Sequence, residues 1–532
     1  MSDLGIQPPR PEGAAEMEIP KRTALRTIVP SILVFIVFLL FLGVFGWFLA
    51  QGLNVSPTLW GARLPRTPSA VQSQESYSST LGALPFTSNP LDPQSPTWVG
   101  AISPSVSVVL GRPTAASIVL NVLSTGDKSI VVDYGTATAT VGLNDRTALA
   151  QLLAGRPQEI MLSSLSGNSR YLYRLVDANT NETLAEGTFH TQRAPGSTFT
   201  FEIQGDSHPE RSEHFNSALY TQVLRSAAMD RPDFYFTSGD DFSVDRLKSV
   251  NATTVAERYL LQRSYLAQVA QFAPVYLVNG NHERGASSQL NGTPNSVGVW
   301  AQTSRNSLFP QPAPDDFYSG DVAQVPYIGQ LRDYYAWVWG DALFVVIDPY
   351  WHSTRKDVAE GWDVTLGNAQ YAWLETTLKT SSAKYKFVFA HHVLGTGRGG
   401  IEQAGLFEWG GENLAGSNEF SRMRPSWGLP IHDLMAKNGV TVFFQGHDHV
   451  FAKQQLDGVV YQTLPNPSEP EYTSGRAKYY HSGVLMPNSG RVRVTVSPEK
   501  TLVEYVRSYL PKDAATKRPD GGIAYSYEIP AR

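Results

Sequence analysis

Five apolar stretches beyond residue 197 each end in residues that commonly bind metal ions. Each stretch has the length and composition of a buried β-strand. The stretches and the residues after them are 198–204 before Asp206 and His208, 233–238 before Asp240, 274–279 before Asn281 and His282, 384–390 before His391 and His392, and 440–445 before His447 and His449. Functional groups gather at the carboxyl ends of strands in α/β sheets, so we expect these side chains to converge on one crevice.

The residue types indicate a particular chemistry. Carboxylate, imidazole and amide oxygen bind Fe, Mn, Zn and similar ions, and a chain without cysteine must use such oxygen and nitrogen ligands. Two ions about 3.5–4 Å apart can activate a water and stabilise the attacking and leaving oxygens of a displacement at phosphorus. One such motif alone is often a turn or a structural histidine, but the five together predict a dinuclear site. In four of them a glycine precedes the first ligand, which predicts a sharp backbone turn at that glycine.

The motif series resembles that of the calcineurin-like metallophosphoesterase superfamily. That series reads D-x-H, GD, GNH[DE], a histidine at a strand end, and GH-x-H. All five occur here in this order, as Asp206-Ser207-His208, Gly239-Asp240, Gly280-Asn281-His282-Glu283, His391 and Gly446-His447-Asp448-His449. The resemblance covers residues 197–510 and implies an α/β fold, with a four-layer α-β-β-α metallophosphoesterase domain.

The resemblance also implies roles for single residues. Asp206, His208 and His449 would bind one metal ion, and Asn281, His391 and His447 would bind the other. Asp240 would bridge the two ions together with a hydroxide nucleophile. His282 would lie beside the leaving-group oxygen, as a general acid or a transition-state stabiliser. The resemblance therefore predicts two metal ions, which would be Fe, Mn or Zn. It also predicts that Asp240 and His282 are catalytic and that Asn281 and His282 contact the substrate.

A second resemblance concerns the region before these motifs. Short strands separated by turn residues, at 105–110, 116–123, 129–135, 171–177 and 182–191, predict an all-β sandwich. A fibronectin-III-like sandwich in this position is similar to the architecture of purple acid phosphatases. The metal motifs depart from that family, however. It has a Tyr three residues after the bridging Asp, where this chain has Ser243, and it lacks the histidine found here as His208. We therefore expect no purple iron–phenolate chromophore.

The N-terminal segments predict a membrane anchor. Residues 1–27 are polar and end in a basic cluster, and residues 28–50 are an uncharged apolar run. As a helix this run would be about 35 Å long, enough for a hydrocarbon core of about 30 Å. The preceding basic residues favour a cytoplasmic tail and an extracytoplasmic remainder. The alternative is secretion after cleavage of a signal peptide, but those usually have a shorter apolar region and an A-x-A-like site.

The remaining sequence divides into a linker and two domains. Residues 51–97 are rich in Ser, Thr, Pro and Gln and are predicted to be a linker. We assign residues 98–195 to the fibronectin-III-like domain and residues 196–532 to the metallophosphoesterase domain. Within the latter, spacing of apolar residues predicts helices at 214–229, 254–272 and 369–378.

Other features bear on substrate and partners. His392 is a candidate substrate contact, and Arg398, in a glycine-rich insertion at 393–428, is a candidate clamp for a phosphate oxygen or an ordinary loop residue. A second insertion spans 284–332. The net charge of −5 shows no basic excess, so nucleic-acid binding is not expected. The absence of cysteine favours a bacterial origin. We thus predict a membrane-anchored extracytoplasmic hydrolase of phosphate monoesters or diesters; the alternative is a metal-stabilised binding or adhesion protein without catalysis.

Overall fold

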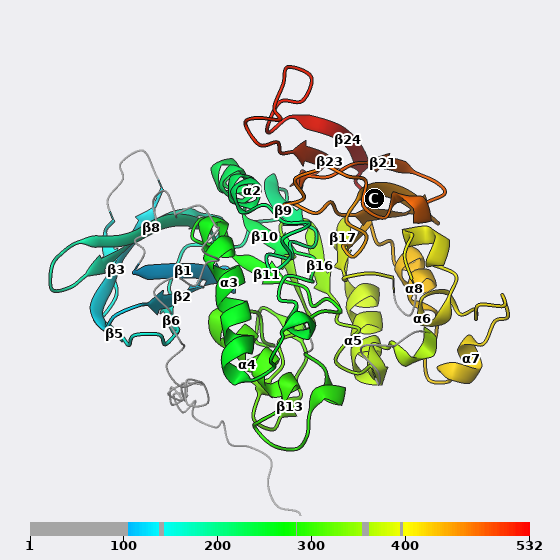
Figure 1. Cartoon of the computed structure of the whole chain (residues 1–532), viewed down its shortest axis with the longest axis horizontal. Coiled ribbons are helices and arrows are strands. Elements are labelled where there is room, and N and C mark those ends of the chain that lie inside the picture. The colour runs from blue at the N-terminus through cyan, green and yellow to red at the C-terminus, as the bar shows by residue number, and fades with distance from the viewer. Residues whose placement is uncertain (1–104, 138–142, 284, 354–360, 394–396) are drawn as a thin grey trace, which may run out of the picture. The chain divides into compact units, whose positions relative to one another are not determined.

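The five strands that lead to the predicted ligands are divided between two β-sheets (Figure 1). The computed structural model describes residues 105–137, 143–283, 285–353, 361–393 and 397–532. The first sheet has the order β11 (Val275–Leu277), β10 (Phe234–Thr237), β9 (Phe199–Gln204), β22 (Gly490–Val496), β23 (Lys500–Arg507) and β24 (Ile523–Pro530). The second has the order β12 (Ser319–Gly320), β15 (Tyr335–Trp339), β16 (Ala342–Val346), β17 (Tyr385–Phe389), β18 (Val442–Gln445), β20 (Val459–Thr463), β19 (Phe451–Leu456) and β21 (Val484–Met486). Strands β9, β10 and β11 are parallel to one another, and so are β17 and β18, so each group ends at one edge.

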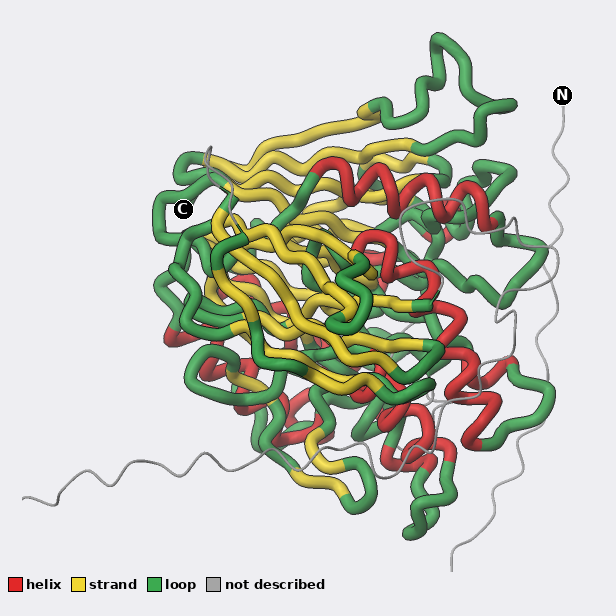
Figure 2. Tube along the Cα trace, turned by 90° about the vertical axis from the view of Figure 1, so that its left-hand side faces the viewer, coloured by secondary structure: helices red, strands yellow, loops and turns green. Residues whose placement is uncertain are grey.

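Aromatic side chains fill the space between the two sheets. Phe201 and Phe236 of the first sheet contribute to one buried cluster with Phe344 and Phe389 of the second. The rings of Phe236 and Phe389 are stacked with centroids 4.1 Å apart. Such a core holds the two sheets face to face. Figure 2 shows the strands of both sheets gathered in the interior of the molecule.

Helices cover the outer face of each sheet. One buried cluster joins the first sheet to α2 (Ser217–Asp230), α3 (Ala252–Ala270) and α4 (Val297–Leu308). Another joins the second sheet to α5 (Gly367–Thr380), α6 (Phe407–Gly410), α7 (Phe420–Met423) and α8 (Ile431–Lys437). The result is the predicted α-β-β-α layering, and the three predicted helices correspond to α2, α3 and α5. The insertion at 284–332 contains α4 as well as the hairpin of β13 (Gln324–Val325) and β14 (Gly329–Gln330).

The region before β9 is all-β in its described residues. One sheet consists of β1 (Val106–Gly111), β2 (Ile118–Ser124) and β6 (Gln158–Leu162). The other consists of β3 (Lys128–Thr136), β4 (Asp145–Arg146), β5 (Ala150–Leu152), β7 (Arg170–Asp177) and β8 (Thr183–His190). Side chains of both sheets form a single buried cluster, as in a sandwich. The five predicted strands are β1, β2, β3, β7 and β8, while β4, β5 and β6 were not predicted from the sequence.

A buried arginine connects this sandwich to helix α3. Arg263 is 1% exposed and donates hydrogen bonds to the side chain of Ser107 at 3.0 Å and to that of Asn121 at 2.8 Å. It also donates to the backbone carbonyls of both residues and to that of Leu308. Every one of these partners is uncharged, and burial lowers the pKa of Arg263 to about 9. The guanidinium therefore fixes the sandwich against the catalytic domain through hydrogen bonds rather than through an ion pair.

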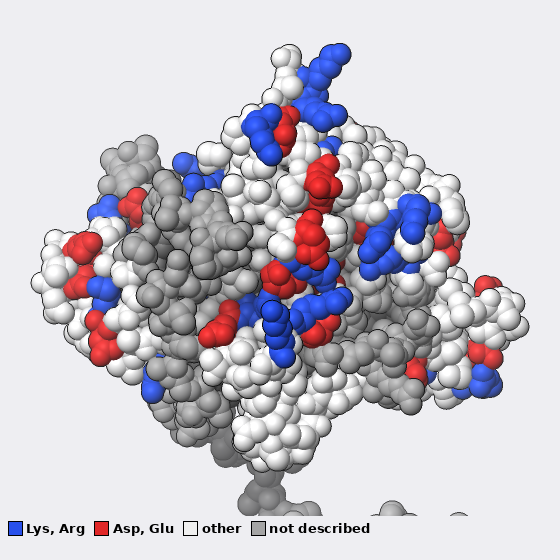
Figure 3. Space-filling model, in the orientation of Figure 1, with Lys and Arg blue, Asp and Glu red and all other residues white. Residues whose placement is uncertain are grey.

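Charged side chains on the surface lie close to partners of opposite sign. Figure 3 shows acidic and basic groups side by side over the middle of one face. Arg493, for example, contacts both Asp230, at 3.1 Å, and Glu504, at 2.9 Å. Among the described residues, no helix is long and apolar enough to cross a membrane. The predicted tail (1–27), anchor (28–50) and linker (51–97) lie outside those residues.

Candidate dinuclear metal centre

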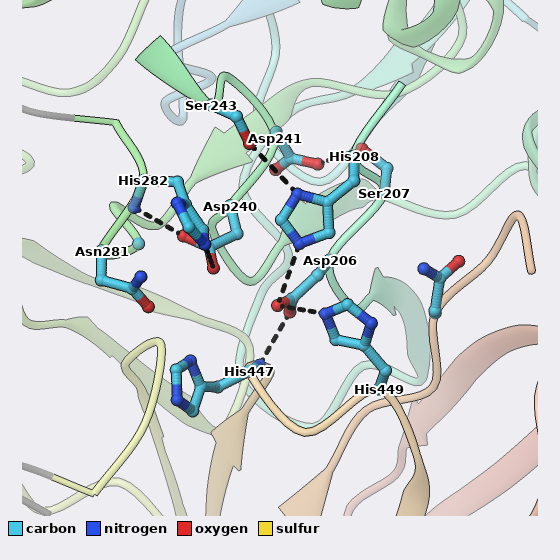
Figure 4. A network of polar contacts seen from close by, with 12 residues as sticks. Asp206, Ser207, His208, Asp240, Asp241, Ser243, Asn281, His282, His447 and His449 are labelled. Carbon is cyan, nitrogen blue, oxygen red and sulfur yellow. Dashed lines mark hydrogen bonds and ion pairs between the residues drawn. The ribbon is translucent and has the colours of Figure 1, made fainter. Parts of the chain in front are cut away.

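The loops that follow β9, β10, β11, β17 and β18 bring the seven predicted ligands together. Their Asp and His members form two triads, in each of which one ligand atom per residue lies within 4.8 Å of the others. The first triad is Asp206, His208 and His449, and the second is Asp240, His391 and His447. Figure 4 shows that His208 and His449 approach Asp206 from one side, while Asn281 and His447 lie on the other side. The division into two groups agrees with that implied by the sequence motifs.

In the second triad, the ligand atoms of the other members lie close to one ring nitrogen of His391. Nε2 of His391 lies 3.0 Å from Oδ2 of Asp240 and 3.1 Å from Nδ1 of His447. The same nitrogen lies 3.1 Å from Oδ1 of Asn281, so the amide joins this group as predicted. Four donor atoms from four separate strand ends thus meet around one point.

The first triad is centred on the carboxylate of Asp206. Its Oδ2 lies 3.1 Å from Nε2 of His449 and 3.8 Å from Nε2 of His208. The other oxygen, Oδ1, accepts a hydrogen bond from the backbone N–H of His447 at 2.8 Å. Asp206 therefore belongs to the first triad and also fixes the loop that carries a ligand of the second.

Second contacts of the imidazole rings determine which nitrogen faces the centre. Nδ1 of His391 donates to the carbonyl oxygen of Ser238 at 2.8 Å, which leaves Nε2 directed at Asp240. Nδ1 of His208 lies 3.1 Å from the hydroxyl of Ser243 and 3.4 Å from Glu210, which leaves its Nε2 directed at Asp206. Such outer contacts are the usual means of orienting a metal-binding histidine.

The charges of the site respond to burial and to one another. Burial lowers the pKa of His391, but the carboxylates of Asp240 and Asp206 outweigh this effect and raise it to about 10. For His447, burial and the neighbouring His392 and His391 lower the pKa well below its ordinary value, which favours the neutral ligand form. Two buried carboxylates lie among imidazole rings that can bind a metal in their neutral form. Together these groups fit two divalent cations.

The sharp turns at the strand ends lie mostly in the ligands themselves. His208, Asp240, His447 and His449 have φ values of 46°, 59°, 67° and 49°, in the left-handed region that such residues rarely adopt. Of the four glycines that precede a first ligand, only Gly239 has a positive φ, of 94°. The other three glycines do not adopt the left-handed region, so among these glycines only Gly239 needs its conformational freedom for a positive φ. A side chain on Gly280 would collide with Asp240, and one on Gly446 with Asp206, so these two permit close approach of the loops.

His282 lies next to Asp240 and is oriented by an acidic partner. Its backbone N–H donates to Oδ1 of Asp240 at 2.9 Å, and its ring Nε2 lies 3.8 Å from Oδ2 of the same residue. Nδ1 lies 2.7 Å from Oδ2 of Asp245, in the short 3₁₀ helix η2 (Val244–Arg246). Burial lowers the pKa of His282, but the charges of Asp240 and Asp245 outweigh it and raise this pKa. The arrangement suits a group that delivers a proton from Nε2.

Two further acidic residues hold the loops in place. Glu283 accepts hydrogen bonds from the backbone N–H groups of Asp241, at 2.8 Å, and Gly280, at 2.6 Å, and so joins the loops after β10 and β11. Asp241 accepts from the hydroxyl of Ser207 at 2.6 Å and from the amide of Gln262 at 3.1 Å. Asp241 thus belongs to a supporting network of buried hydrogen bonds. The roles of Asp245 and Glu283 were not foreseen, although Glu283 lies within a recognised motif.

The candidate substrate contacts lie beside the second triad. Nδ1 of His392 donates to the carbonyl oxygen of Val393, and its ring centroid is 4.7 Å from that of His447. Arg398 donates to the backbone carbonyl of His447 and, at 2.9 Å, to the carboxylate of Asp448. Asp448 also accepts from the hydroxyl of Tyr480 at 2.7 Å. Arg398 is therefore held on the loop of the GH-x-H motif, and its contact with a substrate remains a prediction.

Fold and site together define a class of protein, the metal-dependent phosphoesterases with two candidate metal sites at the strand ends of facing β-sheets. Residues 200–451 match the family model of the calcineurin-like phosphoesterases, so the chain contains a calcineurin-like phosphoesterase domain. The supporting elements outside this range include β22, β23 and β24, which extend the first sheet.

Solved structures agree with this assignment at the level of the fold. A structure of PhoD is 15% identical, covers 80% of this chain and 90% of its own, and superposes with a TM-score of 0.55. The purple acid phosphatase PPD1 from seeds of yellow lupin (Lupinus luteus) is 18% identical, covers 80% of this chain and 74% of its own, and gives a TM-score of 0.50. No curated protein matches the chain.

Proposed function

We propose that this protein is a membrane-anchored, extracytoplasmic phosphohydrolase that cleaves phosphate monoesters or diesters at a dinuclear metal centre. The observation that carries the chemical part is the position of His282. Its ring lies 3.8 Å from the carboxylate of Asp240, which belongs to the second triad, and its centroid is 5.5 Å from that of His208 in the first. A proton donor between two metal-binding triads fits ester cleavage better than a purely structural metal site.

The residues divide the work of the reaction. Two bound divalent ions would supply an activated water and positive charge beside the phosphoryl oxygens. One ion would be held by the first triad, Asp206, His208 and His449. The other would be held by Asn281, His391 and His447, and Asp240 would contact both ions. His282, kept in position by Asp245, would deliver a proton to the departing oxygen. Asn281 and His392 lie on the side of the second triad, where they would border the substrate.

Arg398 is the candidate for a clamp on a phosphate oxygen beside the second triad. One of its nitrogens, Nη1, contacts both Asp448 and the carbonyl oxygen of His447. These contacts hold the planar guanidinium in a defined orientation, which lowers the entropy cost of binding an anion.

The location is proposed from the sequence. The uncharged run at 28–50, preceded by basic residues, supports a single anchor with the catalytic domain outside the cytoplasm. The sandwich of β1–β8 supports a fibronectin-III-like domain between anchor and catalytic domain, because it has two antiparallel sheets with one common core. Protease digestion of intact cells tests the location, since only an extracytoplasmic domain is degraded without lysis.

Activity is tested with the full chain and a generic aryl phosphate in the presence of Mn²⁺, Fe or Zn²⁺. We expect turnover that is lost in Asp240→Ala and in Asn281→Ala, with the thermal unfolding of both variants still cooperative. Full activity in either folded variant would contradict the proposal. Tight metal binding without turnover of monoesters or diesters would favour a metal-stabilised binding protein instead.

A further inference from the structure

A second arginine lies at the metal centre, beside the first triad. Arg211 follows β9 by seven residues and is in the loop that carries Asp206 and His208. Its Nη2 lies 3.0 Å from Nε2 of His282, the nitrogen that faces Asp240. The side chain is 20% exposed, so the guanidinium borders solvent while it contacts the interior of the site.

An acidic residue holds Arg211 in this position. Nε of Arg211 lies 3.3 Å from Oε1 of Glu210, whose side chain is 6% exposed. The same oxygen lies 3.4 Å from Nδ1 of His208, and the other oxygen lies 3.7 Å from Arg258 on helix α3. Glu210 therefore couples the arginine to the first triad, and its contacts leave the Nη2 end directed at His282.

The contact between Arg211 and His282 is weaker than one that a phosphate would offer. Nε2 of His282 offers the guanidinium a single uncharged acceptor when the ring is neutral, and it offers no acceptor when it carries the proton that the general acid needs. A phosphoryl group presents anionic oxygens, to which guanidinium bonds are shorter, stronger and frequently paired. Nε2 of His282 also lies 3.8 Å from Oδ2 of Asp240, so Arg211 contacts a ring that itself borders a carboxylate of the second triad.

We propose that Arg211 is a further substrate-binding residue, which exchanges the imidazole of His282 for a phosphoryl oxygen when a phosphate ester binds. Once Arg211 has moved, Nε2 of His282 can take up a proton from solvent, and the imidazolium then faces the leaving group. Arg211 and Arg398 would then bind the anion from different sides, because Arg398 is fixed beside His447 of the second triad. This inference rests on the proposed function.

The test compares Arg211→Met and Arg211→Lys with the wild type as full chains loaded with Mn²⁺. The matched control is Arg225→Met on helix α2, which removes the same charge from a side chain that contacts Gln268. For each protein we would measure kcat and KM on an aryl phosphate and the Kd of inorganic phosphate by calorimetry. Metal content and the Tm report on folding.

We expect Arg211→Met to raise both KM and the phosphate Kd by about 10- to 100-fold, the loss typical of one charge-assisted hydrogen bond. Arg211→Lys should recover part of the affinity, because lysine keeps the positive charge but lacks the paired N–H donors of the guanidinium. The control should match the wild type. Unchanged KM and phosphate Kd in a folded, metal-loaded Arg211→Met would overturn the inference, and so would a fall in kcat alone. Absence of turnover in the wild type would instead count against the proposed function, while its phosphate titration would still test Arg211. If Arg211→Met does not fold, Arg211→Gln replaces it with the same expected results.

Discussion

The hydroxyl of Ser243 lies 3.1 Å from Nδ1 of His208. These are the two positions at which the motifs depart from those of purple acid phosphatases, and the structure brings them into contact. The histidine belongs to the first triad, and the serine hydroxyl contacts the ring nitrogen on the side away from Asp206. The two departures are thus one local change in the way this metal site is built.

Ser243→Ala should weaken metal binding at the first triad. The substitution removes a contact that fixes the ring of His208, and outer contacts of this kind are typically worth about 10- to 100-fold in metal affinity. Elemental analysis after dialysis against graded chelator would show one metal lost before the other. Ser243→Thr, which keeps the hydroxyl, is the control, and equal retention of both ions in the alanine variant would contradict the expectation.

Metal binding should release protons at neutral pH. Without a cation, Asp240 and Asp206 overcome the effect of burial and raise the pKa of His391 to about 10, so its ring is protonated at pH 7.5. A metal ion can bind Nε2 only after that proton leaves. Calorimetric titration with Zn²⁺ in buffers of different ionisation enthalpy measures the protons released. We expect at least one more for the wild type than for His391→Asn, and an identical count would refute the assignment.

Activity should fall on the alkaline side as His282 loses its proton. Asp240 and Asp245 outweigh burial and raise its pKa above the ordinary value of about 6.5, so the general-acid form persists to higher pH. Asp245→Asn removes one of the charges that raise this pKa. The alkaline limb of kcat/KM should therefore move to lower pH, whereas Asp245→Glu should keep it near the wild-type position. A limb that does not move in Asp245→Asn would argue against His282 as the acid.

Arg398 and Asp448 should act as a unit. Asp448→Asn removes the charge that holds the guanidinium, so it should raise KM by about tenfold, as should Arg398→Met. The double variant should then be little worse than either single one, because contacting residues are not additive. Kinetics of the four proteins give the coupling directly. Additive losses would mean that Asp448 supports the site through Tyr480 instead, and an unchanged KM in Arg398→Met would exclude the predicted clamp.

Arg263→Met should lower the stability of the fold and leave the geometry of the candidate metal centre unchanged. The change leaves buried oxygens of Asn121 and Ser107 without their donor, and such losses cost about 1–3 kcal/mol each in free energy of unfolding. Urea unfolding followed by fluorescence should show a lower midpoint, with Arg225→Met as the control. A wild-type midpoint would mean that the sandwich is held mainly by its apolar contacts.

The sequence by itself identified the candidate ligands and the order of the strands that carry them. Apolar β-branched and aromatic runs define strands locally, and the residue after each run is fixed by the chain, so the predicted strand ends correspond to β9, β10, β11, β17 and β18. The same local reasoning predicted α2, α3 and α5. It did not detect β4, β5 or β6, because such short strands carry little periodicity and depend on their neighbours for pairing.

Only the tertiary structure decided how those ligands are supported. Asp245, Glu210 and Arg211 are ordinary charged residues in the sequence, and their role depends on contacts across loops that no spacing encodes. The structure also gives two of the glycines a role that the sequence did not predict. Gly280 and Gly446 are required because two loops approach closely, which depends on how the sheets are assembled. Local sequence sets strand propensity and ligand chemistry, whereas distances between loops arise when the aromatic core brings the two sheets together.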